Sequence, residues 1–213
     1  MEELNIHYWS HGPHYQFRDS IVFITWRLAG TMPSHILKLF HQLSSEKDEK
    51  IKTYDLQRIK QENARMFKIY QEYDLELAKW DDPGFSLNEA RLGKIVTGAF
   101  HYYAGKKYEL HSYCVMSNHV HVLIRALQDE SENIHSISEI IRLLKSFTAH
   151  EINKALHRTG QLWDDFHFDR IIRDQRNYAN VVNYIMLNPM AAGLVDSPEK
   201  WRDSYCNPEY ASF

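Results

Sequence analysis

The sequence predicts an α+β fold in which a split βαβ antiparallel sheet is covered by helices on one face. Two observations lead to this prediction. Short runs of β-branched and aromatic residues occur along the chain, and the clearest, residues 108–126, is typical of two strands joined by a tight Ser117-Asn118 turn. Other, longer segments repeat apolar residues at helical spacing. No internal repeat or low-complexity segment interrupts this pattern.

The elements follow one another in an order that suits such a sheet. Residues 20–28 are rich in β-branched and aromatic side chains, and the turn residues Gly30 to Pro33 end the run, which predicts a first strand. The later predicted elements are a helix over 87–103, strands over 108–116 and 119–126, a helix over 134–156, a strand over 166–173 and a helix over 176–188. This succession is compatible with a ferredoxin-like arrangement.

Residues 34–80 form a polar stretch between the first strand and the rest of the fold. No glycine or proline lies between Ser34 and Lys79, and charges of nearly alternating sign fill Glu46 to Lys79. Apolar residues recur there near helical spacing, which predicts a short and a long helix with a solvated face. We therefore expect one domain over residues 1–213 with a helical insertion at about 34–80.

Bulk composition limits the class of protein. No stretch approaches the roughly 18 apolar residues of a membrane span, and the acidic N-terminus lacks the order of a signal peptide. Cys114 and Cys206 are the only cysteines and form no CxxC pair, so neither a disulfide framework nor a cysteine zinc site is indicated. We expect a soluble cytoplasmic protein without a membrane partner.

Net charge does not favour a nucleic-acid ligand. The chain has 25 Lys and Arg against 28 Asp and Glu, a formal charge of −3, whereas nucleic-acid binders are usually basic. A local basic groove on a nearly neutral body is compatible with this balance, and the 13 histidines add positive charge if they titrate near neutrality. Composition alone thus permits DNA binding without predicting it.

His119-Val120-His121 is the first motif with chemical content. On a strand, residues i and i+2 point to the same face, so both imidazoles can reach one cation while Val120 points to the opposite layer. The pattern is not specific, because chance alone gives about 0.8 His-x-His pairs in a chain of this length with 13 histidines. Ordinary buried histidines are therefore the competing interpretation.

The second motif is Tyr184-Ile185-Met186-Leu187-Asn188-Pro189. Tyr184 and Asn188 are four residues apart and share one helical face. Pro189 disfavours continued helix, so we expect Asn188 at the helix end with its carboxamide free to bind a ligand. The competing interpretation is a core tyrosine followed by an ordinary helix terminator.

Taken together, the two motifs resemble a known family. Residues 117–124, SNHVHVLI, and residues 183–195, NYIMLNPMAAGLV, resemble the single-tyrosine HUH transposases of insertion sequences, and above all the REP-associated tyrosine transposases. Residues 162–173 look like the segment that links the two blocks in that family, and the resemblance extends from Ile21 to Trp201. Arg170 after Asp169, where relatives often have histidine, and the long 46–80 stretch depart from it.

The resemblance implies an HUH endonuclease core and a mechanism. Tyr184 would attack a phosphate of single-stranded or hairpin DNA, leaving a 5′-phosphotyrosine and a free 3′ hydroxyl. His119, His121 and Asn188 would hold a divalent metal, and mixed nitrogen and oxygen ligands suit Mg²⁺ or Mn²⁺. Tyr178 is a poorer candidate nucleophile than Tyr184, because it points to another helical face and has no amide four residues later.

Several points stay open on the sequence alone. Arg142, Lys145 and Arg173 are candidate contacts to the DNA backbone, although each is also an ordinary solvated charge. A catalytically inactive module that binds repeat DNA and a metal-dependent hydrolase that activates water are the alternative functions. Related enzymes include dimers, so a homodimer is a further alternative.

Overall fold

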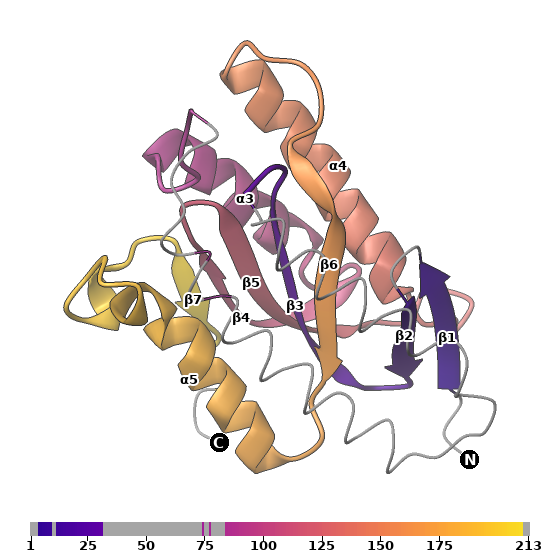
Figure 1. Cartoon of the computed structure of the whole chain (residues 1–213). Coiled ribbons are helices and arrows are strands. Elements are labelled where there is room, and N and C mark those ends of the chain that lie inside the picture. Colours follow the sequence, from indigo (N-terminus) through magenta and orange to yellow (C-terminus); the bar gives the residue numbers. More distant parts are fainter. Residues whose placement is uncertain (1–3, 10–11, 32–73, 75–76, 78–83, 211–213) are drawn as a thin grey trace.

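A five-stranded antiparallel sheet forms the centre of the described part of the chain (Figure 1). The computed structural model describes residues 4–9, 12–31, 74, 77 and 84–210. The sheet order is β6-β3-β5-β4-β7, with strands β3 (Ile21–Leu28), β4 (Tyr108–Val115), β5 (His119–Ala126), β6 (Trp163–Ile171) and β7 (Ser204–Cys206). The helices are α3 (Ala90–Tyr103), α4 (Ile137–Ala155), α5 (Gln175–Ala191) and the 3-10 helix η1 (Pro198–Lys200). Strands β1 (Leu4–Trp9) and β2 (Gly12–Phe17) form a separate two-stranded antiparallel sheet.

The topology is that of two interleaved βαβ units. One unit is β3-α3-β4 and the other is β5-α4-β6, and the order β6-β3-β5-β4 places a strand of each unit between the two strands of the other. β3 pairs antiparallel with both β5 and β6, and β4 pairs antiparallel with β5. The predicted α+β fold class with a split βαβ sheet is confirmed, and β5 has the predicted bounds.

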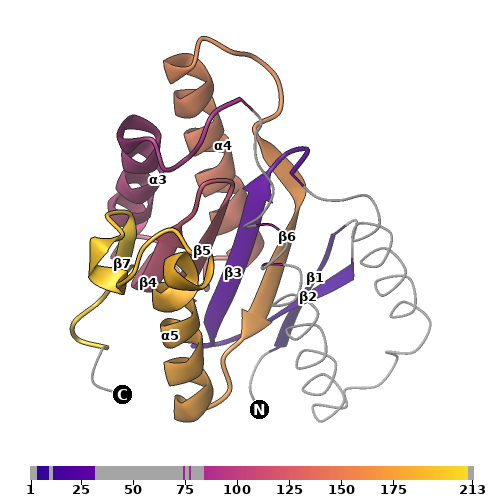
Figure 2. The ribbon, with the colours of Figure 1, turned by 60° about the vertical axis from the view of Figure 1, so that its left-hand side comes forward.

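Helices cover both faces of the sheet, so the expectation of one covered face is wrong. Helices α3 and α4 lie on one face and α5 lies on the other (Figure 2). The reason is the alternation along the central strands, where both sets of side chains are buried. In β3, Val22 and Ile24 join the core under α3 and α4, whereas Phe23 packs with Ile185 of α5 in a second core.

Helix α5 does not end at Pro189. It continues to Ala191 with the proline inside its last turn. Proline lacks one N–H donor, yet the turn still closes, because the N–H of Ala192 donates to the carbonyl of Asn188 and that of Leu194 donates to the carbonyl of Pro189, both at 2.9 Å. The expectation that Asn188 lies at a free helix end is therefore wrong.

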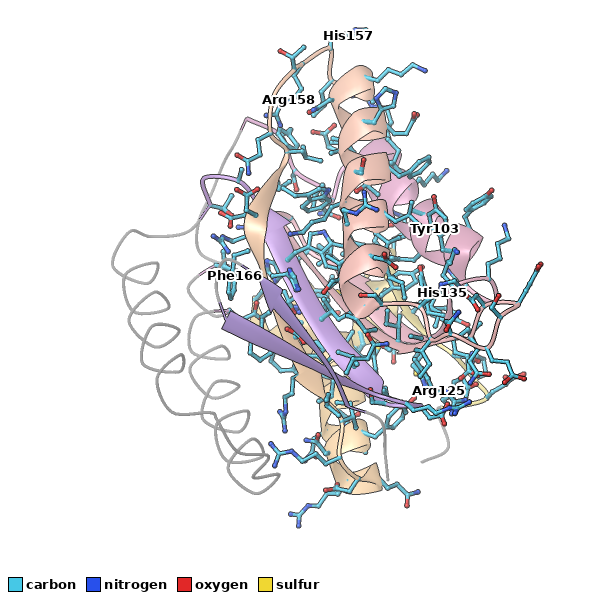
Figure 3. All side chains as sticks on the ribbon, turned by 90° about the vertical axis from the view of Figure 1, so that its right-hand side faces the viewer. Tyr103, Arg125, His135, His157, Arg158 and Phe166 are labelled. Carbon is cyan, nitrogen blue, oxygen red and sulfur yellow. The ribbon has the colours of Figure 1, made fainter. Side chains whose placement is uncertain are left out.

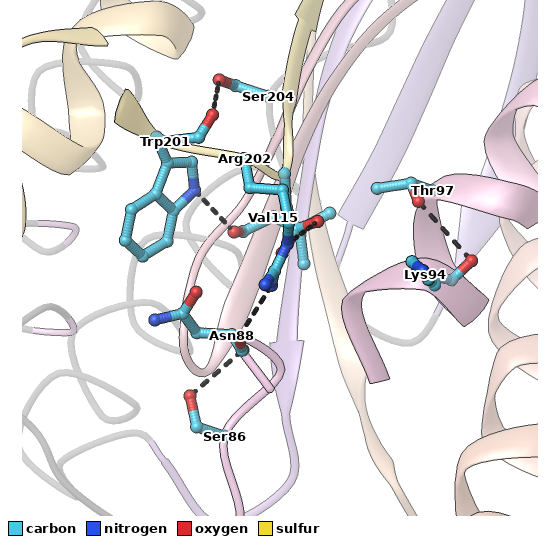
Figure 4. Close-up of polar contacts among 9 residues, drawn as sticks. Ser86, Asn88, Lys94, Thr97, Val115, Trp201, Arg202 and Ser204 are labelled. Carbon is cyan, nitrogen blue, oxygen red and sulfur yellow. Dashed lines mark hydrogen bonds and ion pairs between the residues drawn. The ribbon is translucent and has the colours of Figure 1, made fainter. Parts of the chain in front are cut away.

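The C-terminal segment, which the sequence patterns did not predict as strand, ties β7 to the sheet (Figure 4). The indole N–H of Trp201 donates to the carbonyl of Val115 at 3.0 Å, and the guanidinium of Arg202 donates to the carbonyl of Asn88 at 2.9 Å. The Ser204 hydroxyl donates to the Trp201 carbonyl at 3.0 Å. These contacts hold the segment against β4 and the start of α3.

The predicted helices of the 34–80 insertion lie outside the described residues, apart from Asp74 and Leu77, which are both helical and buried. Within the part of the chain that the structure describes, no helix combines the length and apolar character needed to cross a membrane.

Candidate active site

His119 and His121 lie on β5 and face α5. Both side chains are fully buried, while Val120 between them belongs to the core under α3 and α4. The His121 ring stacks on Phe23 at a centroid distance of 5.7 Å, and the two imidazole rings lie edge to face at 4.8 Å. The same-face prediction for residues i and i+2 is therefore correct in this structure.

Neighbouring side chains fix the orientation of both imidazoles. The Asn118 amide donates to the Leu77 carbonyl at 2.9 Å, which leaves its oxygen to accept from Nδ1 of His119 at 2.6 Å. Nε2 of His119 is then the nitrogen with a lone pair. Nδ1 of His121 lies 2.9 Å from the Thr25 hydroxyl. Both Nε2 atoms are buried without a hydrogen-bond partner among the described residues.

The two Nε2 atoms converge on Asp74. Nε2 of His119 is 3.3 Å from Oδ1 of Asp74, and Nε2 of His121 is 3.3 Å from Oδ2. The carboxylate is 3% exposed. Burial raises its pKa, but the imidazoles of His121 and His119 and the Tyr184 hydroxyl outweigh burial and hold the pKa well below its usual range. Asp74 is thus a buried carboxylate that stays ionised.

His119 stays neutral at physiological pH, as a metal ligand must. Burial lowers its pKa to about 4, although the Asp74 carboxylate opposes that shift.

Tyr184 and Asn188 reach the same carboxylate from α5. The Tyr184 hydroxyl donates to Oδ2 of Asp74, and the Asn188 amide nitrogen donates to that oxygen at 2.8 Å. The Tyr184 ring packs edge to face on His121 at 5.5 Å. Burial, followed by the Asp74 charge, raises the pKa of Tyr184 far above its ordinary value, so the hydroxyl is protonated. Both side chains share one face of α5, as their spacing predicts.

Tyr178 lies elsewhere. Its hydroxyl is 3.0 Å from Nδ1 of His111 rather than beside the β5 histidines. The structure therefore separates the two tyrosines, and only Tyr184 joins the cluster around Asp74.

Asp74, His119 and His121 form a group with the composition of a metal site. One ligand atom from each lies within 4.8 Å of the other two, and all three residues are buried. Two imidazole nitrogens and a carboxylate that face one another are the donors that a divalent cation accepts. The residues present therefore fit a bound metal.

Sequence reasoning missed Asp74 because nothing sets it apart locally. It lies in the 46–80 stretch of alternating charges, which predicts a solvated helix face. Only the tertiary fold brings it to β5, 45 positions before His119 in the chain.

The candidate DNA contacts do not share one surface. Nζ of Lys145 donates to the carbonyls of Asp164, Asp165 and Phe166 at 2.9, 3.3 and 3.2 Å. Burial lowers its pKa to about 8, with Asp164 opposing the shift. Arg142 is exposed on α4, across the sheet from α5. Arg173 is exposed just before α5. The geometry gives Lys145 a structural role and leaves the other two accessible.

Comparison with known proteins finds similarity to transposases. Residues 89–188 match the family model described as Transposase IS200 like. A curated Haemophilus influenzae protein named as a REP-associated tyrosine transposase is 23% identical over 99 residues, which cover 44% of this chain and 56% of that protein. The chain thus spans just over half the length of this relative.

A solved structure of a REP-associated tyrosine transposase bound to a REP hairpin is also similar, with 16% identity and a TM-score of 0.48 over 90% of this chain and 79% of that one. The predicted resemblance to REP-associated tyrosine transposases is confirmed. Residues 89–188, which match the family model, contain His119, His121, Tyr184 and Asn188. Asp74 lies outside the matched residues.

Proposed function

We propose, from the similarity of residues 89–188 to IS200-like transposases, that this chain is a metal-dependent single-strand DNA endonuclease and strand transferase acting on hairpin or repeat DNA in the cytoplasm. One observation supports this most: the Tyr184 hydroxyl and the Nε2 atoms of His119 and His121 meet at one buried carboxylate, that of Asp74. A nucleophile and a set of metal ligands therefore lie in direct contact, as a phosphoryl transfer requires.

His119, His121 and Asp74 would hold the metal, with Mg²⁺ or Mn²⁺ as the proposed ions. When bound, the cation withdraws negative charge from a nonbridging phosphate oxygen. Asn188 now presents its amide nitrogen to Asp74. Half a turn of the carboxamide exchanges nitrogen for oxygen at that position, and Asn188 would then supply the further oxygen ligand that the family resemblance implies.

The chemical step centres on Tyr184. Its oxygen forms a bond to phosphorus as the bond from phosphorus to the 3′ oxygen breaks, which leaves a 5′-phosphotyrosine and a 3′ hydroxyl. The net movement of one proton is from the phenol to the 3′ oxygen. Phe23 and His121 hold the ring on two sides, so the hydroxyl approaches the phosphate in a fixed direction. The phosphotyrosine keeps a phosphodiester bond, and a second 3′ hydroxyl can therefore complete strand transfer without ATP.

One observation favours a catalytically inactive module that binds repeat DNA. The Tyr184 hydroxyl is protonated and already donates to Asp74, so attack on a phosphate requires that this proton leave. In the active enzyme, metal and DNA would replace that contact. In the inactive module, the contact would be permanent.

Covalent capture of DNA distinguishes these functions. Wild type, Tyr184→Phe and Tyr178→Phe are incubated with end-labelled hairpins, taken with their single-stranded flanks from the DNA beside the gene, in Mn²⁺ or in chelator. Denaturing electrophoresis follows. We expect a metal-dependent protein-linked band in wild type and Tyr178→Phe, and a loss of roughly a thousandfold or more in Tyr184→Phe.

Hairpin binding with no linked band in any protein would support the inactive module. Cleavage that survives Tyr184→Phe without a linked product would instead indicate a metal-dependent hydrolase.

A further inference from the structure

A cavity of about 500 Å³ lies near the N-terminal end of α5, and we call it the α5 cavity. Its walls come from β3, β4 and β5, the segment after β6, the start of α5 and the C-terminal segment, and they include His111, Arg125, Arg173, Tyr178 and Tyr210. Figure 3 places Arg125 at the opposite end of the molecule from His157 and Arg158. A volume of this size suits a ligand as large as a nucleotide.

One wall of the cavity is aromatic and held in place. The His111 ring lies against Tyr210 at 4.2 Å and against Tyr178 at 5.6 Å. The Tyr210 hydroxyl donates to Glu109 at 3.3 Å, and Nε of Arg125 donates to the same carboxylate at 2.8 Å. Because these contacts fix the rings before a ligand arrives, a planar group can stack there with little loss of side-chain entropy.

His111 offers this wall one hydrogen-bonding atom that the protein does not use. The side chain is 2% exposed, and its Nε2 has no hydrogen-bond partner among the described residues. The nearest carboxylate oxygen, on Glu109, is 3.8 Å away, beyond hydrogen-bond distance. A buried imidazole nitrogen without a partner is costly, and because His111 is almost fully buried, a ligand bonds to Nε2 only where the side chains around it move aside.

The cavity and the candidate active site lie on the same face of the sheet. Tyr178, which lines the cavity, and Tyr184 both belong to α5 and pack in one core with Phe23. Six helical residues separate them, about 9 Å along the helix axis. A stacked DNA strand rises ~3.4 Å per nucleotide, so a strand held at Tyr184 reaches the cavity within a few nucleotides.

We propose that the α5 cavity takes one unstacked nucleotide of the DNA strand bound at Tyr184, with its base against Tyr210 and His111 and its phosphate near Arg173. This assignment rests on the proposed function. Aromatic rings and a single buried hydrogen-bonding atom suit a base, and the exposed Arg173 guanidinium suits the backbone. The cavity would then help to choose the position at which the strand is cut.

An abasic scan tests the assignment. Binding of hairpins with single-stranded flanks is measured for Tyr184→Phe, which does not consume the DNA, with one base at a time removed from the flank. We expect one position at which the missing base weakens binding about tenfold. In Tyr184→Phe/Tyr210→Ala, that position should bind no worse than its neighbours, because the stacking surface is gone. Tyr184→Phe/Tyr102→Ala is the matched control, since Tyr102 is 62% exposed on α3.

Each other outcome overturns the assignment in a distinct way. If the loss of binding at the abasic position is equal with and without Tyr210, the α5 cavity is excluded as the binding site for that base. The proposed function would then be unaffected. Absence of any hairpin binding would overturn the proposed function as well. Tight binding of free deoxynucleoside monophosphates without a position-specific penalty in DNA would identify a pocket for free nucleotides instead.

Discussion

The two faces of β5 are equally buried, yet they have different chemistry. Val120, Val122 and Ile124 join a continuous apolar core under α3 and α4, whereas His119 and His121 meet Asp74 on the face that α5 covers. All five side chains are 0% exposed. Burial therefore does not distinguish a core position from a site position on this strand, and the unpartnered polar atoms do.

The difference in polar atoms between the two faces of β5 affects the stability of the fold. Each buried polar atom without a hydrogen bond costs about 1–3 kcal/mol, and the α5 face contains such atoms on His119, His121 and His111 among the described residues. The apolar face has no comparable cost along β5. Along β5, this cost falls only on the strand face that α5 covers, which is the arrangement expected where a ligand binds.

Substitutions of His121 and Val122, which are neighbours on opposite faces of β5, should differ most in their effect on DNA cleavage. His121→Ala removes a proposed metal ligand and should lower metal-dependent cleavage by roughly a thousandfold. Val122→Ala should instead lower the free energy of unfolding by about 2 kcal/mol through the cavity it leaves, with cleavage per folded molecule retained. Chemical denaturation and the covalent-capture assay measure the two effects. Equal losses of cleavage would mean that the two faces do not differ in function.

Acid should destabilise the fold through His111. Burial lowers its pKa to about 4, with Glu109 opposing the shift and Arg125 adding to it. Below its ordinary pKa of about 6.5, the unfolded chain binds a proton that the folded chain does not bind until about pH 4. The free energy of unfolding should therefore fall as pH drops from 6.5 towards 4, by up to about 3 kcal/mol from this residue.

Denaturation at several pH values, compared between wild type and His111→Gln, measures that contribution. Between pH 6.5 and 4, the free energy of unfolding should fall less steeply with pH in the variant. The difference in slope should correspond to the binding of about one proton. Parallel curves for the two proteins would mean that His111 is protonated equally in both states.

Asp74→Asn tests whether the carboxylate found only in the structure is a metal ligand. Loss of its charge should weaken Mn²⁺ binding by at least about tenfold, measured by calorimetry. Asp203→Asn is the matched control, because Asp203 is also buried but pairs with Arg202. Unchanged Mn²⁺ affinity in Asp74→Asn, together with a loss in His119→Ala, would assign the third ligand position to Asn188 instead.

The smallest expected effects are those of substituting Lys145, which should change stability, and Arg142, which should change DNA binding. Lys145→Ala should lower the free energy of unfolding by about 1–2 kcal/mol, because three carbonyls lose their donor, and should leave DNA affinity unchanged. Arg142→Ala should leave stability within about 0.5 kcal/mol and reduce the salt dependence of DNA binding by about one counterion. A DNA defect confined to Lys145→Ala would reverse these roles.

The sequence predicted the elements that depend on local patterns. β5 has the predicted bounds because period-two alternation begins after the Ser117-Asn118 turn. The spacing of Tyr184 and Asn188 correctly placed both on one helical face. These features depend on residues only a few positions apart, so local reasoning suffices.

Features that depend on distant pairing were missed. β7 has three residues and exists because it pairs with β4, and β1 and β2 exist as partners of each other in a segment containing Pro13. Asp74 reaches the histidines only through the tertiary fold. Local propensity contains no information on such contacts.

Mapping the protein–DNA linkage tests the central claim most directly. Wild type is incubated with hairpin DNA and Mn²⁺, digested with nuclease and trypsin, and analysed by mass spectrometry. Trypsin leaves Tyr178 and Tyr184 on one peptide, residues 177–200, so fragment ions between them locate the nucleotide. The account predicts a nucleotide phosphate on Tyr184. A linkage on Tyr178, or cleaved DNA with no linked peptide, would contradict it.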